Sequence, residues 1–241
     1  MKFSTISNIG KHRKLNEDYY GNLEKGDLDF FIVADGMGGH SNGEVASKLA
    51  SKIYIDFAQN EEIDSYDSYL DFQEEALRRA NKEIYNLAAS EDGLKMGTTA
   101  VCLIIDKKEK KYYISHLGDS RIYIFRDGEI FYKTRDHSLL NDLLDSGSLT
   151  EDEAKNFKNK SAITKAVGIE EEISPESCLV DMKENDKLLI FTDGLSNELD
   201  DMEIRAIVNE NTDVYEISTK LIKLALDKGG HDNITVTTIL I

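Results

Sequence analysis

Four aspartates stand at the edges of apolar runs in this chain. Asp35 ends the run FFIVAD, Asp193 ends LLIFTD, and Asp232 comes just before ITVTTILI. Asp119 fits the same pattern in ISHLGDSRIYIF. Apolar runs of this length predict buried strands, so we expect each aspartate to lie in a turn at a strand end. Strands that deliver carboxylates to one rim favour a site for hard metal ions.

The candidate ligands are oxygen atoms, since no Cys and His residues cluster at metal spacing. Oxygen ligation suits Mg²⁺ or Mn²⁺. Gly36 and Gly194 would let the backbone turn sharply after each carboxylate, and the Gly36 carbonyl oxygen can face the same ion. Two such ions about 3.5–4 Å apart can share a water, lower its pKa and clamp a phosphoryl oxygen. Hydrolysis of a phosphate ester is the reaction class that follows.

Composition bounds the class of protein. The 241 residues have a net charge of −17, a single proline and no Gly/Ser-rich linker, so we expect a single domain over 1–241. The negative charge argues against nucleic-acid and anionic-membrane partners. No apolar stretch approaches the ~20 residues of a membrane helix, and no signal peptide is evident. We expect a cytoplasmic monomer with Cys102 and Cys178 as buried, reduced thiols.

The hydrophobic periodicity predicts mainly runs of strands, with helices between the runs. We expect strands at 3–9, 28–34, 98–105, 111–116, 121–125, 129–133, 179–182, 188–191 and 234–241, and helices at 44–57, 69–87, 138–146, 150–157 and around 214–224. Strands that follow one another favour an α+β fold with antiparallel sheets covered by helices. The polar stretch 138–175 is the least core-like segment, and we interpret it as a flap.

Eight short motifs occur along the chain in this order: RKLNEDYY at 13–20, VADGMGGH at 33–40, MGTTA at 96–100, LGDSRIY at 117–123, RDHS at 135–138, ITKAVG at 163–168, LLIFTDGL at 188–195 and GGHDNITV at 229–236. Together they resemble the motif set of metal-dependent protein Ser/Thr phosphatases, the PPM or type 2C family, in its bacterial form. The resemblance implies an α-β-β-α sandwich of two antiparallel β-sheets flanked by helices.

The resemblance also implies a role for individual residues at two catalytic ions, Mn²⁺ or Mg²⁺. Asp35 would bridge both ions. Asp193 and Asp232 would complete the ligands of the first ion, and the Gly36 carbonyl oxygen those of the second. Asp18 would hold metal-bound water from behind these ligands.

Two more residues acquire roles in the same way. Asp119, together with Asp193, would bind a third and weaker ion near the flap. Arg13 would hold the substrate phosphate. The family's mechanism is then attack on phosphorus by a hydroxide that bridges the metals, with phosphoserine and phosphothreonine in proteins as substrates and a bacterial Ser/Thr kinase as the opposing enzyme.

The general acid is left open. Animal-type members have a His directly after the Asp-Gly step, where this chain has Met37. His40 is the nearest substitute, although a role in the DGMGGH turn is equally open, and metal-bound water can also supply the proton.

Other classes fit less well. A HAD-type phosphatase needs Asp-x-Asp, but Met37 and Leu195 stand two residues after Asp35 and Asp193. An HD-type hydrolase places its His-Asp pair on a helix, whereas a strand-like run follows Asp232. A non-catalytic phosphoprotein-binding module on the same fold would have lost a metal-binding aspartate, and none is missing. A narrower alternative is an enzyme dedicated to one regulatory protein, such as an anti-sigma antagonist.

Overall fold

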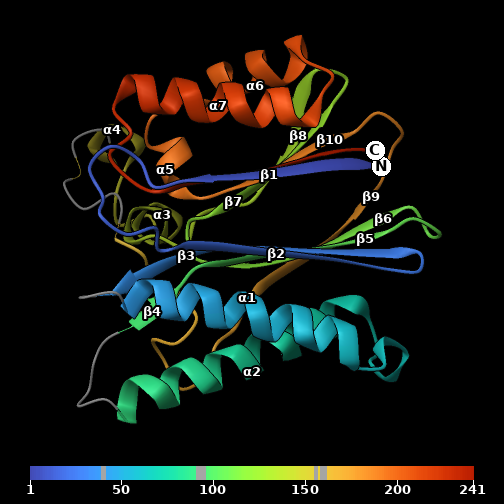
Figure 1. Cartoon of the computed structure of the whole chain (residues 1–241). Coiled ribbons are helices and arrows are strands. Elements are labelled where there is room, and N and C mark those ends of the chain that lie inside the picture. The colour runs from blue at the N-terminus through green and yellow to red at the C-terminus, as the bar shows by residue number, and fades with distance from the viewer. Residues whose placement is uncertain (39–41, 91–95, 155–156, 158–161) are drawn as a thin grey trace.

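Two antiparallel β-sheets, stacked face to face, form the middle of the protein (Figure 1). The computed structural model describes residues 1–38, 42–90, 96–154, 157 and 162–241. The first sheet runs in the order β1 (Lys2–Asn8), β11 (Ile234–Leu240), β10 (Lys187–Phe191), β7 (Arg121–Arg126) and β8 (Glu129–Lys133). The second runs in the order β2 (Asp18–Lys25), β3 (Leu28–Gly38), β5 (Ala100–Asp106), β6 (Lys111–Leu117) and β9 (Glu176–Asp181), with β4 (Met96–Thr98) also paired to β3.

Helices cover the outer face of each sheet (Figure 1). α1 (Asn42–Asn60) and α2 (Tyr69–Ser90), joined through a 3₁₀ turn at Ile63–Ser65, pack on the second sheet. α6 (Asp201–Glu210) and α7 (Val214–Lys228) pack on the first. This arrangement confirms the predicted α+β class and the α-β-β-α order of layers.

Three apolar layers hold the sandwich together. One lies between the sheets and is built from both, for example Val33 and Val101 against Ile122 and Ile190. The other two lie under the helices. Because β3 and β5 are covered on both faces, their sequences are nearly continuous apolar runs instead of alternating ones.

The helix α2 buries the face predicted from its periodicity, with Phe72, Ala76 and Ile84 fully inside. On α1 the periodicity predicts a face of Val45, Leu49, Ile53 and Phe57. Phe57 is buried, and Leu49 and Ile53 pack against the core, but Val45 is 43% exposed and Ala46 and Ala50 are buried in its place. The small alanines let α1 lie close to β3.

The elements that were not predicted include β2 and α6. β2 is a mostly exposed edge strand without an apolar pattern. α6 is a polar helix in which only Ile204 and Val208 are buried. The flap segment 138–175 contains α3 (Leu139–Asp145) and α4 (Glu151–Ala154) and adds no strand to either sheet among its described residues. The predicted helix at 150–157 is therefore shorter, and part of it lies outside the described residues.

β7 and β8 form a hairpin with a two-residue turn. Asp127 and Gly128 both have positive φ, at 52° and 81°, as a tight two-residue turn between antiparallel strands requires. None of the described helices is both long and apolar enough to cross a membrane.

Candidate metal centre

The sandwich brings the predicted aspartates to one cavity of about 230 Å³ at the rim of the two sheets. Its described lining includes Arg13, Asp35, Gly36, Asp119, Asp193 and Asp232. Asp35 comes from the second sheet, whereas Asp193 and Asp232 lie beside β10 and β11 of the first. His40, the candidate general acid, lies outside the described residues.

The expectation that each aspartate lies in a turn was wrong for two of them. Asp35 lies inside β3, which does not end there because it exchanges its neighbour β5 for β4 and continues to Gly38. Asp193 is the first residue of a short helix, α5 (Asp193–Ser196). Asp119 and Asp232 do lie in irregular segments beside strands.

Gly36 is needed for close approach and not for a sharp turn. A Cβ atom at Gly36 would lie 2.0 Å from the Gly43 carbonyl oxygen and 2.7 Å from that of Glu17. Gly194 has the same function, since a Cβ there would lie 2.0 Å from the Asn233 carbonyl oxygen. The predicted reason for these glycines is thus corrected: they let backbone segments meet at the carboxylates.

Asp18 lies directly behind the cavity, paired in register with Asp35 across β2 and β3. Its Oδ2 accepts hydrogen bonds from the Thr192 hydroxyl at 2.9 Å and from the Thr235 hydroxyl at 2.7 Å. Its Oδ1 is buried and finds no hydrogen-bond partner among the described residues. Burial, together with the charges of Asp193 and Asp232, raises the pKa of Asp18 to about 7.

The pKa values of three other carboxyl groups at the cavity are raised as well. Burial, with repulsion from neighbouring carboxylates, raises the pKa of Asp35 well above its usual range and also raises the pKa of Asp193. The pKa of Asp119 rises to about 7 for the same reasons, and its buried Oδ1 has no described partner. Crowded carboxylates with unpartnered oxygens are a donor set that fits hard divalent cations, which would remove the repulsion.

Thr99, which the sequence analysis did not single out, supports Asp35. Thr99 accepts a hydrogen bond from the Asp35 amide at 2.9 Å, and its own amide donates to the Asp35 carbonyl oxygen at 2.8 Å. The Thr99 hydroxyl also contacts that of Ser120 at 2.7 Å, which links Asp35 to the turn that carries Asp119. The motif MGTTA was the available signal for Thr99.

Asn233 fixes the loop that carries Arg13. Its side chain donates to the carbonyl oxygens of Ile9 and Leu15 at 2.8 and 2.9 Å and accepts from the Glu17 amide at 2.8 Å. Arg13 Nη2 donates to Asp232 Oδ2 at 2.6 Å, and the arginine side chain is 48% exposed. One cation therefore stands at the open side of a cluster of carboxylates.

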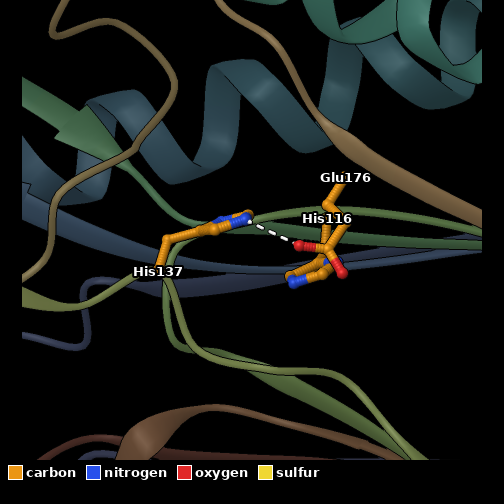
Figure 2. A group of neighbouring side chains, drawn as sticks. All are labelled: His116, His137 and Glu176. Carbon is orange, nitrogen blue, oxygen red and sulfur yellow. Dashed lines mark ion pairs between the residues drawn. The ribbon is translucent and has the colours of Figure 1, made fainter. Parts of the chain in front are cut away.

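A second group, His116, His137 and Glu176, lies outside this cavity (Figure 2). The two imidazole rings stack at 4.7 Å with an angle of 7° between their planes. Ring nitrogen lone pairs lie in the ring plane, so two parallel rings do not direct them at one ion. The Gly118 amide donates to His137 Nδ1 at 3.2 Å, which places the ring proton on Nε2, 3.4 Å from Glu176 Oε2. His137 Nε2 is buried and has no hydrogen-bond partner among the described residues. Because the ring geometry does not suit one ion, we interpret the group as a structural support and not as a metal centre.

Comparison with known proteins identifies the family. The model described as Protein phosphatase 2C matches residues 10–224. Protein phosphatase PhpP of Streptococcus pneumoniae is 35% identical over 240 residues, which cover 99% of this chain and 97% of that protein. The S. agalactiae serine/threonine phosphatase superimposes with a TM-score of 0.89 at 34% identity, over 98% of each chain. The catalytic domain of the phosphatase PstP, solved with 2 manganese ions, superimposes with a TM-score of 0.83 at 31% identity, over 100% of this chain and 98% of that one.

The chain therefore belongs to the protein phosphatase 2C family. It is a metal-dependent protein Ser/Thr phosphatase.

Proposed function

We propose that the chain hydrolyses phosphoserine and phosphothreonine in proteins at the cavity that Asp35, Asp193 and Asp232 line, and that it opposes a Ser/Thr protein kinase. The observation that carries the proposal is the gathering of buried, mutually repelling carboxylates beside a single arginine. In a protein of net charge −17, a phosphate ester is attracted only where bound cations change the sign of the local field.

The residues present fit two divalent ions, for which Mn²⁺ is supported by the manganese-bound relative. Asp35, Asp193 and Asp232, with the carbonyl oxygen of Gly36, would hold them, and Asp18 would support them from behind. When bound, such ions lower the pKa of a water and offset the charge of a phosphoryl group. Asp119 with Asp193 would hold a third, weaker ion on the flap side.

The protein's own groups bind and orient the phosphate. Arg13 uses one of its five N–H donors on Asp232, so others remain for phosphate oxygens. Thr192 and Thr235 keep Asp18 fixed. No Ser, Thr, Cys or His belongs to the described lining of this cavity, which favours direct attack by water over a phospho-enzyme on one of those side chains. The products are the free hydroxyl side chain and inorganic phosphate.

The test is hydrolysis of an aryl phosphate and of a phosphothreonine peptide with Mn²⁺ or with EDTA. We expect Mn²⁺-dependent turnover that Asp193→Asn abolishes and that Asp227→Asn, an exposed change on α7, leaves intact. Binding of phosphoprotein without turnover in the wild type with Mn²⁺ would establish the non-catalytic binding module instead.

A further inference from the structure

A second cavity, of about 550 Å³, opens beside the metal centre and shares Asp119 and Asp193 with it. The end of β8, the start of β7 and the beginning of the flap form its walls. Three cations, Arg121, Lys133 and Arg135, line it together with three aspartates, Asp119, Asp136 and Asp193. We call this cavity the basic groove.

The basic groove is unusual in this chain because cations are scarce: 29 Lys and Arg stand against 46 Asp and Glu. Since the two cavities share Asp119 and Asp193, they adjoin, and a peptide whose phosphate reaches the metal centre can extend into the groove. We propose that the groove binds a second acidic group of the substrate, so that the enzyme selects phosphoproteins with a further phosphate or carboxylate close to the phosphorylated residue. This inference rests on the proposed function and names its substrate class.

The three cations differ in how firmly they are already paired. Arg121 makes two hydrogen bonds to Asp136, at 2.7 and 2.6 Å, and this pair is mostly buried. Such a bidentate pair is a fixed part of the wall. Arg121 therefore forms part of the groove wall, and its charge is already neutralised by Asp136.

Lys133 and Arg135 are available. Lys133 pairs with Asp201 at 2.7 Å, and Arg135 makes two hydrogen bonds to Asp145, at 3.1 and 2.6 Å, in a pair that is far more exposed than that of Arg121. All four side chains are between 42% and 62% exposed. Exposed ion pairs contribute little net free energy. A second acidic group of the substrate, kept nearby because the first phosphate is bound at the metal centre, can therefore displace them. Asp201 and Asp145 then act as internal competitors of the substrate's acidic group.

The experiment compares three phosphothreonine peptides that differ at one position, two residues before or after the phosphothreonine. That position holds glutamine, glutamate or a phosphonate analogue of phosphoserine, which resists hydrolysis. The readout is the ratio of kcat/KM for each acidic peptide to that for the glutamine peptide, with Mn²⁺ present. We expect about a fivefold preference for the phosphonate, a smaller one for glutamate, and a decrease of both as salt rises.

Two pairs of variants should change this ratio in opposite directions. Lys133→Gln and Arg135→Gln should each lower the ratio about two- to threefold. Asp201→Asn and Asp145→Asn should raise the ratio, because they remove the competing carboxylates. The asparagine that replaces Asp201 can still accept the hydrogen bond from the Tyr123 hydroxyl. Lys108→Gln, which removes an exposed charge between β5 and β6, is the matched control and should leave the ratio unchanged.

The outcomes distinguish a failure of the groove proposal from a failure of the proposed function. Equal kcat/KM values for the three peptides, with Mn²⁺-dependent turnover of all, overturn the groove and leave the proposed function standing. A loss of selectivity in Lys108→Gln as large as in Lys133→Gln also overturns it, because the effect is then the field of the whole protein. Absence of turnover with every peptide overturns the proposed function itself.

Discussion

His137 bonds to both peptide groups of Gly118. Its amide donates to the Gly118 carbonyl oxygen at 3.0 Å, and its ring Nδ1 accepts from the Gly118 amide at 3.2 Å. Gly118 directly precedes Asp119, and the carbonyl oxygen of His137 accepts from the amide of Thr164 in the flap at 2.9 Å. One buried residue thus connects the flap to the turn that carries a candidate metal ligand.

We therefore expect His137 to position Asp119. His137→Ala should raise the Mn²⁺ concentration for half-maximal turnover about two- to tenfold, the value of one lost hydrogen bond. His137→Asn should recover most of this loss, because its side-chain oxygen can accept from the Gly118 amide. If both variants lower only the melting temperature and leave the Mn²⁺ dependence unchanged, the role of His137 is purely structural.

The hydroxyl that supports Asp18 gives a second prediction. Thr235→Val keeps the shape of the side chain and removes the 2.7 Å hydrogen bond to Asp18. The carboxylate then loses one of its two donors, so we expect weaker Mn²⁺ binding by about 1–2 kcal/mol, measured by calorimetry. Thr237→Val, in the same strand, removes a bond to Thr5 at 2.8 Å and should leave metal affinity unchanged. Equal effects of the two changes would contradict a specific role for Thr235.

The pKa shifts predict how stability depends on pH without metal. The pKa of Asp18 and of Asp119 is about 7 in the folded protein, above the usual 3.8 of the unfolded chain. The metal-free folded protein therefore holds protons that the unfolded chain has lost, and its stability falls as pH rises through 7. Between pH 6.5 and 8 we expect a loss of about 1–2 kcal/mol for the two groups together.

Thermal unfolding in EDTA and in Mn²⁺ at these two pH values is the measurement. Mn²⁺ should stabilise more at pH 8, where the carboxylates are ionised. The comparison stays above pH 6.5 because His137 has the opposite effect on stability below it. Burial lowers the pKa of His137 to about 4, so its contribution to the free energy of unfolding is lost as pH falls below 6.5. A metal-free protein that is more stable at pH 8 than at 6.5 would contradict the assignment.

Arg13 provides the fourth prediction. Arg13→Ala should lower kcat/KM for a phosphopeptide about 10- to 100-fold, the range for charged hydrogen bonds. Arg13→Lys should be intermediate, since it keeps the charge but loses the two-pronged geometry. Lys14→Ala, an exposed neighbour, should have little effect. Equal activity of the alanine variant and the wild type would show that Arg13 does not hold the phosphate.

The positions of the buried strands could be predicted because burial on two faces makes β3, β5 and β10 nearly continuous apolar runs. The edge strand β2 could not, because its exposed side chains carry no pattern. α6 buries only Ile204 and Val208, but its capping box, Asp200 with Glu203, was a usable signal for its first turn.

The acidic residues of the site could be predicted from the sequence, but the residues that hold them in place could not. The aspartates stand beside apolar runs, which local sequence reveals. Thr192 and Thr235 meet Asp18 because β10 and β11 pair in one register, and no local pattern encodes a contact between residues 174 and 217 positions apart. The prediction of turns at Asp35 and Asp193 failed because a change of strand partner and a short helix also place a carboxylate at a sheet's rim.

β11 lies between β1 and β10, so Ile234–Leu240 pairs on one side with Lys2–Asn8. Asp232 stands just before β11 and Thr235 lies in it, so we expect both to reach the centre only when this pairing forms. Contacts between such distant segments form slowly in folding. During refolding, turnover should therefore return last, after the helices have formed, and a chain cut before Ile234 should never acquire it. The return of activity therefore indicates that the strands of the first sheet have paired.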